Sequence, residues 1–138
     1  MARGLLPLAL VAGLMAGPGA CAPAPAPAER GEAAAFAPAY GAIAASMLDT
    51  GLQGVRVTME GARGPADADA YARCASVGYA LGNGAKFLRH IRTNIDEEGG
   101  IWHADAVYTV SPDLPEGVQV IDAETAAAEC ADQGIPTV

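Results

Sequence analysis

The first 35 residues combine a short apolar run with an Ala-Pro tract, a combination typical of a segment that lies outside the folded domain. The fold must therefore be built from the residues that follow. A basic start precedes an apolar run, "GLLPLALVAGLMAG", that is short and interrupted by Pro7, as in a secretory signal segment rather than a membrane span. An alternating tract, "APAPAPA", favours extended polyproline II backbone. We expect a signal peptide over 1–20, a tether over 21–35 and one small domain over 36–138.

Cys21 stands between the apolar run and the Ala-Pro tract. Gly19 and Ala20 before it resemble the lipobox of bacterial lipoproteins, although Pro18 stands where Leu or Val is usual. The resemblance implies palmitate-type acylation of Cys21 and anchoring in a membrane of the cell envelope, facing the periplasm, with the outer membrane favoured over the inner. The prolines after Cys21 disfavour ordinary signal cleavage. Secretion without lipid and an uncleaved anchor are the alternatives.

Three cysteines form an odd set, but lipidation of Cys21 would leave Cys74 and Cys130 as a pair. An oxidising envelope compartment permits a disulfide between them. Two buried free thiols are the competing interpretation. No CxxC spacing occurs in the sequence, so nothing indicates a thioredoxin-like redox centre.

The charge balance argues against one class of partner. Eight Lys plus Arg stand against 16 Asp plus Glu, which gives a net charge of −8. Such a surface repels phosphate backbones, so no nucleic-acid partner is expected. Aromatic residues make up 5% of the chain, which indicates a modest core built largely on small side chains.

The first half of the domain predicts a helix, a strand and a longer helix. Phe36, Tyr40, Ile43 and Met47 recur at helical spacing, which predicts a short helix over 38–49. "GVRVTMEG" alternates between apolar and polar residues, as a half-buried strand does. Pro65 and Asp67 suit the first turn of the next helix, which "GNG" at 82–84 ends. The apolar stripe of this helix is Ala70, Cys74, Val77 and Leu81.

The second half predicts a hairpin followed by a helix. "KFLRHIRTNI" and "IWHADAVYTV" are expected as antiparallel strands around "DEEGG", with Ile95 pairing near Gly100 and His90 opposite Asp105. One face of the second strand carries Trp102, Ala104, Ala106, Tyr108 and Val110. "VQVI" is a candidate edge strand, and 122–134 a helix capped by Asp122. The fold class is α+β: a small antiparallel sheet of three to four strands with helices packed on one face.

Two histidines raise the question of a metal or ligand site. The predicted register places His90, His103 and Asp105 on one sheet face, where a two-His-one-carboxylate metal or ligand site is conceivable. The alternative is a solvated polar face. The acidic run 96–98 lacks calcium-loop spacing, and no serine stands in a GxSxG context. We therefore expect a non-catalytic domain with no cofactor, and we do not predict a metal site.

The order of strand, helix and hairpin from Val55 to Val110, with "GA" at 84–85, is similar to that of several small envelope lipoproteins of bacteria. These include uncharacterised lipoproteins and, more distantly, the outer-membrane lipoprotein that senses envelope stress. No functional residue carries over from this resemblance beyond Cys21. The anchor and the missing catalytic motifs favour binding or scaffolding at the membrane surface, including envelope assembly or stress sensing, with an envelope protein as candidate partner. The alternative is a small-ligand or metal-binding domain, or a minor enzyme, using the His90/His103/Asp105 face.

Overall fold

The computed structural model describes residues 35–138, so the predicted signal segment, Cys21 and most of the tether lie outside the described residues. The elements follow in the order β1 (Ala39–Asp49), β2 (Leu52–Glu60), α1 (Pro65–Gly82), β3 (Phe87–Glu98), β4 (Ile101–Ser111), β5 (Ile121–Asp122) and α2 (Ala123–Asp132). Within the described part of the chain, no helix is long and apolar enough to cross a membrane.

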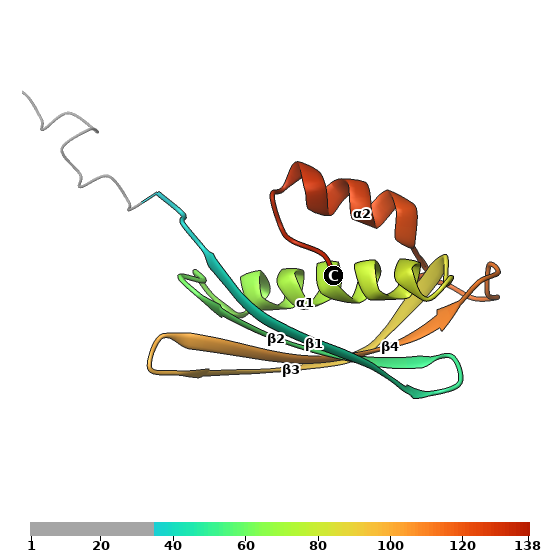
Figure 1. Cartoon of the computed structure of the whole chain (residues 1–138), viewed down its shortest axis with the longest axis horizontal. Coiled ribbons are helices and arrows are strands. Elements are labelled where there is room, and N and C mark those ends of the chain that lie inside the picture. The colour runs from blue at the N-terminus through green and yellow to red at the C-terminus, as the bar shows by residue number, and fades with distance from the viewer. Residues whose placement is uncertain (1–34) are drawn as a thin grey trace, which may run out of the picture. The chain divides into compact units, whose positions relative to one another are not determined.

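All strand pairs are antiparallel, and the order across the sheet is β1-β2-β4-β3-β5. The strands form one layer, α1 lies across one face of it, and α2 lies over α1 (Figure 1). The α+β class is therefore confirmed, but the sheet has five strands rather than three to four. The second helix packs on the first and not directly on the sheet, apart from its contacts with β5.

The extra strand is β1, and the helix predicted over 38–49 is wrong. Tyr40, Ile43 and Met47 do share one side, toward α1, but a bulge between Tyr40 and Ile43 adds a residue to the strand. Residues on the same side of a strand are normally two positions apart, but the inserted residue makes Tyr40 and Ile43 three positions apart. This spacing is also typical of a helix, so the sequence pattern predicted one. Pairing with β2 through the tight turn at Thr50–Gly51 decides the outcome.

The core lies between α1 and the sheet and is built largely on small side chains. The apolar residues of β2 predicted to face one way, Val55, Val57 and Met59, are all at most 2% exposed. Four of the eight buried residues of α1 are alanines, which lets α1 approach the strands closely. The predicted stripe was rotated: Cys74 and Val77 are buried, whereas Ala70 and Leu81 lie half-buried at its margin.

The β3–β4 hairpin exists with the predicted inward face of β4, but its register differs from the prediction. The acidic residues 96–98 belong to β3, and only Gly99 and Gly100 form the turn, both with positive φ. Two glycines can adopt the tight turn that suits the twist of a hairpin. Ile95 consequently pairs with Ala104, and His90 pairs with Tyr108 rather than with Asp105.

The cysteine pairing is confirmed. Cys74 of α1 and Cys130 of α2 form a disulfide with their Cα atoms 5.9 Å apart. Both cysteines are buried, at 2% and 1% exposure, so the bridge joins the facing sides of the two helices. The side chain of Asp122 caps α2 as predicted, accepting a hydrogen bond of 2.8 Å from the backbone N–H of Thr125.

Candidate functional site

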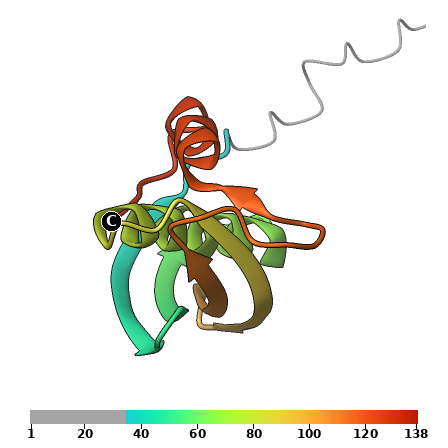
Figure 2. The same ribbon diagram turned by 90° about the vertical axis from the view of Figure 1, so that its right-hand side faces the viewer.

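The side of the sheet that points away from α1, called the open face below, is covered by neither of the helices that residues 35–138 form (Figures 1 and 2). It carries the side chains that alternate with the core residues along each strand. From the strand pairing and the lining of two surface hollows, these are Ala44, Ser46 and Leu48 of β1, Arg56 and Thr58 of β2, His103, Asp105 and Val107 of β4, and Arg92, Asn94 and Asp96 of β3.

An ion network lies at the centre of the open face. Asp105 accepts a hydrogen bond of 2.8 Å from Nε of Arg56 on one neighbouring strand and one of 3.4 Å from Nη1 of Arg92 on the other. The two arginine side chains are 78% and 48% exposed, so the network contributes little to stability. It holds two guanidinium groups beside one carboxylate, a local excess of positive charge on an acidic protein.

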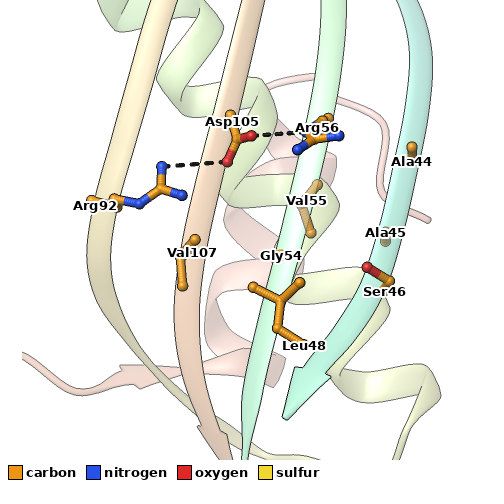
Figure 3. A pocket seen from close by; sticks show the side chains of 10 residues that line it. All are labelled: Ala44, Ala45, Ser46, Leu48, Gly54, Val55, Arg56, Arg92, Asp105 and Val107. Carbon is orange, nitrogen blue, oxygen red and sulfur yellow. Dashed lines mark hydrogen bonds and ion pairs between the residues drawn. The ribbon is translucent and has the colours of Figure 1, made fainter.

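Two hollows of about 410 and 420 Å³ flank this network and share Ala44, Arg56 and Asp105. Figure 3 shows the first, with Leu48 and Val107 providing apolar walls below the ion network. Gly54 contributes no side chain to its floor, and Leu48 folds to within 3.1 Å of the place where a Cβ would stand. This hollow could hold a small amphipathic group with its anionic end on the guanidiniums.

More polar and charged residues line the second hollow than the first. Thr58, Asn94, Asp96 and His103 contribute to its lining. The pairing of Asp96 with His103 places the histidine next to an acid across β3 and β4. This end of the open face can donate and accept hydrogen bonds, and unlike the first hollow it also contains the Asp96 carboxylate.

The predicted set of His90, His103 and Asp105 is not brought together. His103 and Asp105 lie on the open face, but the bulge between His90 and Arg92 places His90 on the helix side. There the His90 ring contacts Thr93 Oγ1 at 2.7 Å and meets the Tyr108 ring edge-on, with 5.1 Å between centroids. No group of three potential metal ligands occurs among residues 35–138.

His90 instead borders a hollow of about 390 Å³ on the helix side, together with Asp69, Arg73, Tyr108 and Gln119. Burial, aided by the charge of Asp69, raises the pKa of the Tyr108 phenol well above its usual value. The phenol therefore stays protonated and can serve as a hydrogen-bond donor, not as a nucleophile. Sequence periodicity identified Tyr108 as a core residue, and it could not place His90 beside it because the bulge had no sequence signal.

The family described as the YNQ4 C-terminal domain matches residues 40–134. The chain belongs to this family. The YNQ4 C-terminal domain therefore begins inside β1, ends just beyond α2 and includes the open face and both bridged cysteines. Cys21 precedes the matched stretch.

A curated relative is described as an uncharacterized 26.9 kDa protein in the nqo8 5' region of Paracoccus denitrificans. It is 40% identical over 77 residues, which are 54% of this chain and 30% of the relative. The chain thus matches under a third of that relative's length. No solved structure matches the chain.

Proposed function

We propose that this YNQ4 C-terminal domain protein is a membrane-anchored lipoprotein of the bacterial envelope that binds or scaffolds other envelope proteins and is not an enzyme. The observation that supports its compartment most strongly is the Cys74–Cys130 disulfide. Structural disulfides persist in oxidising compartments and are rare in the cytosol. The lipobox-like residues before Cys21 supply the anchor in this proposal.

The tether then explains how the domain reaches its partners. The alternating Ala-Pro tract rises about 3.1 Å per residue in polyproline II conformation, which spaces a domain from the lipid surface. Multiple acyl chains on Cys21 would make the attachment stable, since each buried CH₂ contributes about 0.8 kcal/mol. A protein held in this way meets its partners at the membrane, in envelope assembly or stress sensing.

The open face is the binding surface that this proposal favours. Both oxygens of Asp105 accept hydrogen bonds from guanidinium groups, and such pairing orients Arg56 and Arg92 for recognition of an acidic or polar surface. The hollows of 410 and 420 Å³ favour a second candidate, a small anionic amphipathic ligand bound at the same place. Each candidate requires the two arginines.

Metabolic labelling with palmitate tests the anchor. The wild-type chain should carry the label and sediment with membranes, and Cys21→Ser should lose both properties. Cys130→Ser is the matched control, because it removes a cysteine that the proposal leaves unacylated. Pro18→Leu should be labelled at least as well as the wild type. An unlabelled wild-type chain, or label retained by Cys21→Ser, refutes lipidation.

Crosslinked pull-down from envelopes tests the binding surface. Partners captured by the wild-type protein should be lost with Arg56→Ala/Arg92→Ala, a pair that leaves the core untouched. Arg63→Ala, which changes an arginine paired with Asp67 beside α1, should retain them. Equal recovery by all three proteins refutes a role for the open face.

A further inference from the structure

The sheet has two edges, and they differ in how they are protected. On one side, β5 pairs only with Phe87 and Leu88, so the rest of β3 is also an edge. That stretch, Arg89–Glu98, carries two arginines and three acids and contains a bulge. Charges and bulges are the devices by which natural sheets prevent edge-to-edge pairing.

The other edge, β1, has a bulge near each end, between Tyr40 and Ile43 and between Met47 and Asp49, but the stretch between these bulges has none of these devices. Ala39 to Leu48 contains no charged residue and no proline, and β1 pairs only with β2 among the described elements. Figure 2 shows β1 at the margin of the sheet. Met47 and Leu48 are 41% and 55% exposed. An exposed, apolar, uncharged edge strand is a template for another strand.

Contacts inside the domain secure the first part of β1. The carbonyl of Gly41 accepts a hydrogen bond of 2.7 Å from the Tyr71 hydroxyl, and the N–H of Ala42 donates one of 3.1 Å to Thr58 Oγ1. The bulge therefore consumes backbone groups at Gly41 and Ala42. The regular stretch from Ile43 to Met47, which ends before a second bulge at Leu48, is left to pair with a strand from outside.

We propose that this edge binds a second copy of the chain, with the two β1 strands antiparallel about Ala45. In this register Ile43 lies opposite Met47 of the other copy and Ala44 lies opposite Ser46. Residues on the helix side meet helix-side residues, and open-face residues meet open-face residues, because paired positions share a face. Met47, which is 41% exposed, thereby gains an apolar neighbour in Ile43 of the other copy.

Self-pairing fits the strand better than a filament or an unrelated peptide does. An isologous contact uses the same patch on both chains and closes after two copies. The edge of β3 carries charges that the paired stretch of β1 lacks, so it offers no comparable partner and growth beyond a dimer is opposed. Asp49 is the only charge of β1 and lies beyond the paired stretch, so the acidic chains meet where neither carries a charge. Pairing joins two five-stranded sheets and makes their open faces continuous.

Cysteine crosslinking tests the register. Chains carrying Ala44→Cys are mixed with chains carrying Ser46→Cys, both in a full-length Cys21→Ser background so that the result does not depend on lipidation. These two positions are exposed and lie opposite each other in the proposed dimer. We expect a disulfide-linked mixed dimer. Asn94→Cys mixed with Ser46→Cys is the matched control for β3, and equal crosslinking in that control refutes the register.

Charge exchange tests the interface itself in the same Cys21→Ser background. Sedimentation equilibrium should show a dimer for the parent chain and monomers for Ala44→Lys/Ser46→Lys and for Ala44→Glu/Ser46→Glu. Mixing the Lys and Glu variants should restore dimers, because each Lys then faces a Glu. Unchanged melting temperatures show that the variants are folded. A monomeric parent chain, or dimers in the Lys variant alone, overturns the proposal. Binding of an extended peptide by a monomeric parent would assign the edge to another protein instead.

Discussion

Loss of the Cys74–Cys130 bridge should release α2 while leaving α1 on the sheet. The bridge spans 56 positions of sequence, and a loop of that size corresponds to about 4 kcal/mol in the chain-entropy account of disulfides. Domains of this length have unfolding free energies of about 5–15 kcal/mol. The bridge therefore supplies a large share of the stability.

The burial of α2 explains why the effect should concentrate there. Its buried residues are Ala123, Ala126 and Cys130, and a buried methyl group contributes roughly 0.8 kcal/mol. The two alanines thus contribute about 2 kcal/mol, less than the bridge does. A helix of ten residues is also marginal in isolation. Docking of α2 therefore depends on the covalent link.

The test compares the wild type with Cys74→Ala/Cys130→Ala. Guanidinium unfolding should show a loss of about 4 kcal/mol. Native-state hydrogen exchange should show nearly unprotected amides over Ala123–Asp132 and persistent protection in β2 and β4. Cys21→Ser is the matched control, since it removes a cysteine outside the bridge, and its stability should not change. A double variant within about 1 kcal/mol of the wild type, with α2 still protected, refutes this reasoning.

Three further changes test smaller features. Ser76→Ala should stabilise the protein by up to about 1 kcal/mol in a denaturant titration. The reason is that the Ser76 hydroxyl is buried without a hydrogen-bond partner and that alanine favours the helix. A clear loss of stability would show that the hydroxyl does have a hydrogen-bond partner. Asp105→Asn should cost no more than about 1 kcal/mol, since the ion pairs are exposed, and a larger loss by the same titration would contradict that assignment. Hydrogen bonds from Arg63 lower the pKa of Asp67, so this pair should stabilise the fold above about pH 4 and lose its effect as the pH falls through the lowered value. Melting curves of Asp67→Asn from pH 7 to 2 should show a smaller acid destabilisation than the wild type, and an unchanged acid limb would exclude the pair as a cause.

The local sequence pattern was sufficient to predict those elements in which the apolar residues follow a single period without interruption. The alternation of Val55, Val57 and Met59 predicted β2, and proline and glycine marked the two ends of α1. Both succeed because backbone preferences and side-chain alternation act within a few residues. Pairing of Cys74 with Cys130 could be predicted from cysteine parity and an oxidising compartment, before any geometry was known.

The candidate site depended on features that have no local signal. A bulge at Gly41–Ala42 made β1 resemble a helix, and another at Ile91 moved His90 to the side opposite His103. Each bulge adds one residue to a strand of period two, which reverses the side on which later residues lie. The Arg56–Asp105–Arg92 network likewise joins three strands that are distant in sequence.

The sequence by itself determined the composition of the core, the ends of α1, the cysteine pair and the candidate anchor, because these rest on residue type and short-range spacing. Tertiary structure decided which strands are neighbours, where the bulges fall and which edge remains unprotected. The order β1-β2-β4-β3-β5 places β2 beside β4 although α1 and β3 lie between them in the sequence, a long-range packing choice that no single segment encodes. The open face and the free edge of β1 exist only because of that choice.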